Sequence, residues 1–440
     1  MKERIVLLII ISLLVAFLVV FQNYFNTMWA IIFLLGFMFL YTVYMWAVTK
    51  YQKRKLKKAP PIVTCAYHPF VSILIPCHNE ENVIEKTVLN VLELEYGDFE
   101  IILTDDRSSD KTPEIIERLA NEHDKIKFLI RDKSAKAGKS AVLNDAMKIA
   151  KGDAILVFDA DAKIEADFLN KMIPFLEHAD VGAVQARKVI INSKQNFLTQ
   201  CQYNEYVLDT HLQVGRDAVR GAVELRGNGE LIKLQALKSI NFWNEETITD
   251  DLDMSTRLHI KGWDIRFCSE AAVYEEGVID FYALIRQRRR WVEGSIRRYL
   301  EYIKDVFTSS DMSLRVGFDL IAYITEFLLP FWLVAEILIQ AIHFVKGDEN
   351  CVLSSIVVVV ATGIFFTACF IYSLKKYAKY SFWRSFYEAI VTSIYFITIW
   401  FPIALFIIFK IIFTKKTMDW GKTVHGVANC SIIERVQDND

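Results

Sequence analysis

The sequence predicts an α/β domain with a mainly parallel sheet, placed between two groups of membrane-spanning helices. From Phe70 onward, short strand-like runs alternate with amphipathic helical patterns, which is typical of βαβ units. Long apolar runs lie before and after this region, and 53% of the 440 residues are hydrophobic, more than a purely soluble chain carries. We therefore expect a transmembrane hairpin with a basic linker over 1–58, the α/β domain with interfacial helices over 59–300, and a membrane region and tail over 301–440.

The N-terminal region holds two apolar runs, residues 5–21 and 28–48, each about as long as a bilayer requires. A signal peptide is the alternative for the first run, but the run is long and a second follows at once. Six cations then lie within residues 50–58. By the positive-inside rule, this end and the domain after it are expected in the cytoplasm of a multi-pass plasma-membrane protein.

The α/β domain is predicted from five strand-like runs and the helical patterns between them. The expected strands are 71–75, 100–104, 127–130, 154–158 and 181–185, and the expected helices are 80–93, 111–122, 139–150 and 166–177. Two further helices, 196–215 and 282–302, are amphipathic but too polar to span, so we expect them at the membrane surface.

Three apolar stretches follow the domain, residues 316–345, 352–374 and 386–413. The last is flanked by cations on both sides, Arg384 before it and Lys410, Lys415 and Lys416 at its end. A single crossing would therefore place a basic tail outside, against the positive-inside rule. Either Pro402 marks a re-entrant break or the tail is external.

Charge and cysteine content exclude some functions. The net charge of -2 argues against a nucleic-acid partner, which would require a basic excess. The seven cysteines include no C-x-x-C pair, so neither a zinc site nor a disulfide framework is indicated.

The strongest chemical signal is a pair of carboxylates, Asp159 and Asp161, which follow a strand-like run that is apolar throughout. Ligands of open α/β sheets bind at the carboxyl ends of strands, and paired acids there suit a divalent cation that holds a phosphate. An Asp-rich turn is the alternative explanation for this pair alone.

Other polar residues follow neighbouring strands. Asp105 and Asp106 end the second strand, where a base and ribose could be recognised, and Asn79 follows the first. Taken singly, each loop is better explained by helix capping, with Asn79 as one N-cap and Ser109 or Asp110 as the other. Lys139 begins a helix and would add a cation to its free N–H groups, which favours an anion site, although a solvated lysine is the alternative.

Two charged clusters come later in the chain. Five acids lie within 245–253, which is costly unless a metal, an arginine or a raised pKa offsets the repulsion. Residues 286–291 then form a dense basic patch with a tryptophan. Contact with anionic lipid is one explanation, and stabilisation of a diphosphate leaving group is the other.

Four motifs in this order, flanked by membrane spans, resemble those of processive family 2 glycosyltransferases, which include cellulose, chitin, hyaluronan and poly-N-acetylglucosamine synthases. They are Asp105-Asp106, Asp159-Ala160-Asp161, Thr249-Asp250-Asp251 and the Q-x-x-R-W motif Gln287-Arg288-Arg289-Arg290-Trp291. The resemblance covers about residues 70–294. Asp250 stands where the family usually has Glu, and Trp420 resembles a tryptophan motif of some relatives.

The resemblance implies a GT-A fold, a UDP-sugar donor and a divalent Mg²⁺ or Mn²⁺. It assigns Asp251 as the general base for an inverting transfer. On the donor side, it places Asp105 and Asp106 at the uridine and Asp159 and Asp161 at UDP and the metal. The residues that it places at the diphosphate and the acceptor entrance are Lys139, Gln287, Arg290 and Trp291.

We expect UDP-N-acetylglucosamine as the donor and a growing β-linked polysaccharide as the acceptor, passed through the bilayer. A small auxiliary membrane subunit is a further partner that the resemblance suggests. The alternatives are a glucan, mannan or hyaluronan product, transfer of one sugar to a lipid carrier, a non-catalytic export scaffold, and a nucleotidyltransferase.

Overall fold

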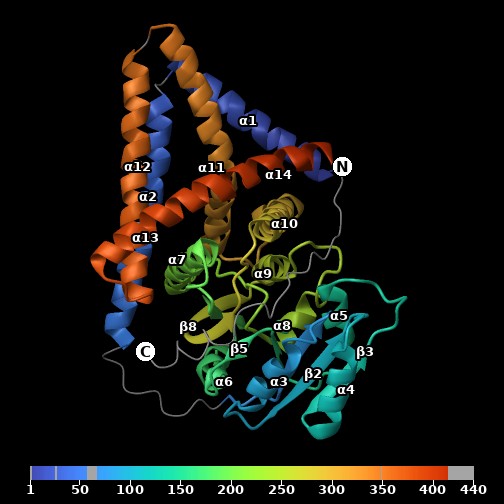
Figure 1. The fold of residues 1–440 in the computed structure, drawn as a ribbon. Coiled ribbons are helices and arrows are strands. Elements are labelled where there is room, and N and C mark those ends of the chain that lie inside the picture. The colour runs from blue at the N-terminus through green and yellow to red at the C-terminus, as the bar shows by residue number, and fades with distance from the viewer. Residues whose placement is uncertain (1, 25–26, 57–66, 348, 415–440) are drawn as a thin grey trace.

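The structure is a computed structural model that describes residues 2–24, 27–56, 67–347 and 349–414. Figure 1 shows an α/β domain on one side and a group of long helices on the other. The weak tryptophan motif at Trp420 lies outside the described residues, as do Lys415 and Lys416.

The domain is built on a mixed, mostly parallel sheet of eight strands in the order β3-β2-β1-β4-β7-β6-β8-β5. The strands are β1 Val71–Cys77, β2 Phe99–Asp105, β3 Ile126–Ile130, β4 Ala154–Val157, β5 Lys163–Ile164, β6 Val181–Ile190, β7 Glu230–Lys233 and β8 Asp264–Glu275. The pairs β1/β2, β1/β4, β2/β3 and β6/β8 are parallel, whereas β4/β7, β6/β7 and β5/β8 are antiparallel.

The five predicted strands are confirmed, but the prediction missed β5, β7 and β8. β1, β2 and β4 are buried throughout, as apolar runs covered on both faces should be. β7 is short and carries Glu230, whereas β8 begins with alternating charged residues, so neither has the apolar run that marked the others. Antiparallel β7 joins the two parallel groups of strands.

Short helices cover the faces of the sheet: α3 Ile84–Leu92, α4 Thr112–Glu122, α5 Lys139–Ala146, α6 Phe168–Met172, η1 Ile173–Glu177, α8 Leu234–Ser239 and α9 Asp250–Ile260. The predicted helix 139–150 ends early at Ala146, and the predicted helix 166–177 is instead α6 followed by the 3₁₀ turn η1, which carries Pro174. Two clusters of buried apolar residues form the core of the domain.

The long helices are α1 Lys2–Tyr24, α2 Thr27–Leu56, α7 Phe197–Val219, α10 Phe281–Thr308, α11 Leu314–Val345, α12 Glu349–Tyr377, α13 Phe382–Tyr395, the π turn η2 Phe396–Trp400 and α14 Phe401–Phe413. Within the described part of the chain, one continuous helix, Phe382–Phe413, is long and apolar enough to cross a membrane. The expected multi-pass arrangement therefore stays a prediction.

The helix Phe382–Phe413 runs across α11 and α12 in Figure 1 and contacts the helices next to the domain at both ends. Near its start, Asn204 of α7 donates to Glu388 Oε2 at 2.8 Å. Near its end, Lys410 pairs with Glu293 of α10 at 2.6 Å. The helix continues through Pro402, which lacks an N–H for the helical ladder and follows the π turn. A break at Pro402 is therefore not formed.

Candidate active site

The parallel pairs β1/β2 and β1/β4 place their carboxyl ends at one edge of the sheet, where the predicted acids after β2 and β4 lie. Cys77 is in register with Asp105 in the pair β1/β2, and β4 lies on the other side of β1. Asp159 follows β4, and its backbone N–H donates to Asn228 Oδ1 at 3.2 Å. Asp161 lies two residues further in the same turn and is half-buried.

Lys139 supplies the central positive charge of the site. Its ammonium donates to Asp159 Oδ1 at 2.7 Å and to the carbonyl oxygen of Gly227 at 2.8 Å. Burial opposes this charge, yet attraction from Asp159, Asp250 and Glu230 keeps the pKa of Lys139 above its ordinary value. The lysine predicted to bind an anion thus pairs with carboxylates of the site.

Asp251 faces this lysine across Gly227. A Cβ atom placed on Gly227 would lie 3.3 Å from Asp251 Oδ2 and 3.6 Å from Lys139 Nζ. Gly227 also has a φ of 74°, a backbone conformation that favours glycine. Because Gly227 has no side chain, Asp251 of α9 can approach Lys139, which in turn binds Asp159.

The electrostatics of these acids are those of a crowded, buried site. Burial, followed by repulsion from Asp250, raises the pKa of Asp251 to about 6. The same two causes raise the pKa of Glu230 to about 8. Glu230 Oε1 and Asp250 Oδ2 are buried and lack a hydrogen-bond partner in the described part of the chain. Such shifts are typical of functional sites.

Glu230 was missed by the sequence-based prediction. It begins β7, and its Oε2 accepts from the N–H of Gly227 at 3.3 Å. The signal available in the sequence was its place immediately after the glycine-rich turn Gly227-Asn228-Gly229.

A divalent cation fits beside Asp159 and Asp161 only if a ligand supplies further oxygen atoms. Among the described residues, no group of three or more His, Cys, Asp or Glu side chains could hold a metal by itself. Mg²⁺ commonly binds through one or two carboxylates together with substrate phosphates. Asp159 Oδ1 already accepts from a cation, the Lys139 ammonium. The donor set therefore suits a metal that arrives with a diphosphate.

The two acids after β2 differ in their surroundings. Asp105 Oδ2 accepts from Ser108 N at 3.1 Å, whereas its Oδ1 is buried and lacks a partner among the described atoms. Asp106 is fully buried, and its Oδ1 accepts from Arg131 at 2.6 Å and from Arg107 at 2.9 Å. Asp105 thus keeps an oxygen for a ligand, while Asp106 holds two arginines.

Asn79 does not cap a helix. Its φ is 55°, and its Oδ1 accepts from Ser109 N at 2.7 Å, so it joins the loop after β1 to the loop after β2. Helix α3 begins only at Ile84, after Val83, with no side-chain cap. The capping alternative for Asn79 was therefore wrong.

The Q-x-x-R-W motif lies in the N-terminal part of α10 and is organised around a residue that the prediction did not single out, Arg288. Its buried guanidinium donates to Gln287 Oε1 at 2.9 Å and pairs with Glu205 of α7 at 3.0 Å. It also lies 4.1 Å from the ring centroid of Trp291 and 5.3 Å from that of Trp400. One face of Trp291 is thus engaged by a cation, and Arg290 is half-buried beside it.

Helix α10 packs directly on the start of α9, which carries Asp251. A Cβ atom at Gly294 would lie 2.4 Å from Thr249 Cγ2, so the absence of a side chain there permits this contact. Arg298, one turn further along, donates to Glu224 Oε1 at 2.8 Å and to the carbonyl oxygen of Leu252 at 3.1 Å. The motifs at 249–251 and 287–291 therefore lie on α9 and α10, two helices that pack against each other.

The chain resembles known proteins along most of its length. The model of a family described as Glycosyltransferase like family 2 matches residues 68–294. A beta-monoglucosyldiacylglycerol synthase of Trichormus variabilis is 39% identical over 360 residues, which cover 81% of this chain and 76% of that protein. The synthase of the same name from Synechocystis sp. is 33% identical over 413 residues, covering 89% and 85%.

Two further similarities are more distant. A poly-beta-1,6-N-acetyl-D-glucosamine synthase of Staphylococcus epidermidis is 29% identical over 372 residues, which cover 82% of each chain. The solved structure of the mannosyltransferase PcManGT from Pyrobaculum calidifontis, in complex with GDP-Man and Mn²⁺, has a TM-score of 0.58 at 21% identity and covers 83% of this chain and 96% of its own. This last likeness shows the fold, which is GT-A-like.

The contact at Gly294 generates a prediction. Gly294→Ala should lower the free energy of unfolding by about 1–3 kcal/mol, because the added methyl group overlaps Thr249 and must displace the start of α9. Gly363→Ala in α12 is the matched control, since no atom lies within 4 Å of its added Cβ and alanine favours a helix. Thermal unfolding of both purified variants would test this. Equal transition temperatures for the two variants would contradict it.

Proposed function

The chain belongs to glycosyltransferase family 2, and on this premise we propose that it transfers a single sugar from a UDP-sugar to the hydroxyl group of diacylglycerol, with inversion at the anomeric carbon. The main support for an inverting transfer is that Asp251, the proposed base, approaches Lys139 across Gly227. The lipid acceptor is supported by the relatives at 39% and 33% identity, which are named beta-monoglucosyldiacylglycerol synthase. UDP-glucose is accordingly the first donor to test.

Asp251 is proposed as the general base. A base works best when its pKa lies near the working pH, and burial together with Asp250 raises the pKa of Asp251 to about 6. The carboxylate would take the proton of the acceptor hydroxyl as that oxygen attacks the anomeric carbon and the bond to UDP breaks. A single displacement turns an α-linked donor into a β-linked product.

The donor side is assigned to the opposite wall of the site. Lys139 would exchange its contact with Asp159 for the diphosphate, and Gln287 and Arg290 would add polar contacts from α10. The unpartnered oxygen of Asp105 is available to the uracil or ribose, while Asp106 positions Arg131. Mg²⁺ or Mn²⁺, when bound by Asp159 and Asp161, would supply positive charge for the leaving diphosphate.

Synthesis of a β-linked polymer from UDP-N-acetylglucosamine is the second candidate. It is supported by the relative at 29% identity, which is named as a polymer synthase, and by the presence of Gln287, Arg290 and Trp291 at their family spacing. It requires Trp291 to meet a growing chain with the ring face that does not pack against Arg288. The single transfer is favoured by the higher identity of the relatives named beta-monoglucosyldiacylglycerol synthase. Family membership also disfavours the scaffold and nucleotidyltransferase alternatives.

We further propose that the chain is a multi-pass protein of the plasma membrane with its domain in the cytoplasm. This rests on the apolar runs and basic segments of the sequence and on the long helices outside the domain. A membrane-embedded acceptor such as diacylglycerol would then reach the domain from the bilayer. An auxiliary subunit remains a prediction from the resemblance alone.

The identity of the product tests the proposal. Membranes that contain the chain, incubated with labelled UDP-glucose and diacylglycerol, should release UDP and form a lipid that carries one labelled sugar and dissolves in organic solvent. A labelled product that is water-soluble and larger than a single sugar would instead support the polymer. Labelled UDP-N-acetylglucosamine in a parallel reaction compares the two donors.

Removal of the proposed base should abolish turnover without abolishing donor binding. Asp251→Asn is expected to lower the rate of UDP release by about 100-fold or more, in the range typical for loss of a general base. Asp98→Asn, a neutralisation at an exposed position of the same domain, is the control and should leave the rate unchanged. A rate for Asp251→Asn close to that of the wild type would remove Asp251 from the mechanism.

The raised pKa of Asp251 predicts a pH dependence. The carboxyl group is protonated below its pKa of about 6 and cannot accept a proton there, so kcat should rise with pH through that value and then level off. Initial rates at saturating donor between about pH 5 and about pH 8 would show this limb. A profile that is flat across that interval would argue against this assignment.

A further inference from the structure

An acid with no role in the transfer described above lies behind the turn after β4 that carries Asp159 (the Asp159 turn). This acid, Glu275, ends β8, and its side chain is 12% exposed. Its Oε1 accepts from the hydroxyl of Tyr206 at 2.8 Å. Its Oε2 accepts from Asn228 Nδ2 at 3.2 Å and pairs with the Lys188 ammonium at 2.8 Å. Glu275 thus joins α7, β6 and the turn before β7 at the back of the donor site.

Asn228 connects this acid to the Asp159 turn. It is fully buried, and its Oδ1 accepts from the backbone N–H of Asp159 at 3.2 Å. An ionised carboxylate only accepts hydrogen bonds, so Glu275 fixes the Asn228 amide with Nδ2 toward itself and Oδ1 toward Asp159. The carbonyl oxygen of Asn228 accepts from Gln185 Nε2 at 2.9 Å, which holds the backbone of the same residue. The orientation of the amide that binds the Asp159 turn therefore depends on Glu275.

The turn before β7 is also held between two lysines. Lys139 donates to the carbonyl oxygen of Gly227 at 2.8 Å. Lys188 donates to the carbonyl oxygen of Arg226, the preceding residue, at 3.4 Å. Two consecutive carbonyl groups are thus bound by cations from different elements, α5 and β6, and the second cation is the partner of Glu275.

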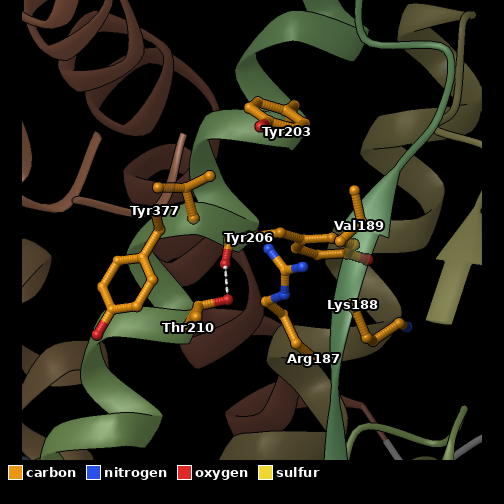
Figure 2. A pocket seen from close by; sticks show the side chains of 8 residues that line it. Arg187, Lys188, Val189, Tyr203, Tyr206, Thr210 and Tyr377 are labelled. Atoms are coloured by element: carbon orange, nitrogen blue, oxygen red, sulfur yellow. Dashed lines mark hydrogen bonds between the residues drawn. The ribbon is translucent and has the colours of Figure 1, made fainter. Parts of the chain in front are cut away.

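The charge of Lys188 is felt at Asp159. Burial opposes that charge, yet attraction from Glu275 and, less strongly, from Asp159 keeps the pKa of Lys188 above its ordinary value. Figure 2 shows Lys188 pointing away from Arg187, and the ring of Tyr206 reaching from α7 to β6. The Lys188 ammonium lies 5.4 Å from the centroid of that ring. Without Glu275, the acid that attracts Lys188 most strongly, its charge would be drawn to Asp159.

We propose that Glu275 is a positioning residue of the donor site, which keeps Asp159 in place for a divalent cation and the diphosphate of the UDP-sugar. The inference rests on the donor and the metal of the proposed function. Glu275 acts through two residues: Asn228 holds the backbone of the Asp159 turn, and Lys188, when paired, does not compete with a cation for the Asp159 carboxylate. Residues that orient metal ligands in this way commonly change metal affinity by about 10–100-fold.

Binding of UDP with Mn²⁺ tests the inference without a sugar or an acceptor. Calorimetric titration of the purified full chain with UDP, in the presence of Mn²⁺, gives the dissociation constant. Glu275→Gln should raise this constant about tenfold, because the neutral side chain releases Lys188 and no longer fixes the Asn228 amide. Glu270→Gln, the same change at an exposed position of β8, is the control and should leave the constant unchanged.

A double variant separates positioning from a general loss of structure. Asn228→Asp alone places two carboxylates against each other and should weaken binding at least as much as Glu275→Gln. In Asn228→Asp/Glu275→Gln, the hydrogen bond can form with donor and acceptor exchanged, and the total charge equals that of the wild type. The double variant should therefore bind UDP with Mn²⁺ within about threefold of the wild type.

The possible failures can be told apart. A wild-type chain that does not bind UDP with Mn²⁺ would overturn the donor assignment, and this inference with it. A wild type that binds, with Glu275→Gln binding equally well, would overturn the inference alone. If Glu275→Gln loses thermal stability as well as affinity, the double variant decides. Recovery of affinity in the double variant supports positioning, and losses that add refute it.

Discussion

The candidate site depends on one buried lysine held among carboxylates. The Lys139 ammonium binds Asp159 and the Gly227 carbonyl oxygen, and it also faces Asp251. Two of the surrounding acids, Asp251 and Glu230, have raised pKa values because burial and mutual repulsion disfavour their charge. In the proposed transfer, Lys139 would contact the diphosphate, and Asp159 and Asp161 would hold a divalent cation that supplies positive charge to it. The site thus offers groups of both signs of charge.

Helix α10 connects this site to the helices outside the domain. Through Gly294 and Arg298 it holds the start of α9, and through Arg288 it binds Glu205 of α7 and the ring of Trp400 near α14. The buried Arg288 lies between two tryptophans and has few alternative arrangements. Its charge must stay in contact with Glu205 and with the faces of both rings. The position of Asp251 is therefore determined partly by helices that lie outside the α/β domain.

The relatives named beta-monoglucosyldiacylglycerol synthase are the reason to propose a lipid rather than a polymer as the acceptor. The Q-x-x-R-W motif does not separate the two, because the contact with Arg288 engages only one face of the Trp291 ring. The helix Phe382–Phe413 contacts α7 near its start and α10 near its end, so it lies over the domain instead of leading away from it. Such a helix can border a lipid substrate, and just before its start Tyr380 meets Tyr203 of α7.

The sequence alone determined the local elements and the chemistry of individual motifs. Buried strands such as β4 are short apolar runs, and Asp159, Lys139 and Asp251 follow such runs or begin helices at spacings that a family resemblance could recognise. It did not reveal β7 or Glu230, because a four-residue strand with a charged end carries no period of its own. It also could not assign Arg288, since the neighbours that make this residue central, Glu205 and Trp400, are remote in the chain. Only the tertiary structure decided that Asp251 meets Lys139 and that Asp106 holds arginines, because burial and charge pairing depend on which segments pack together.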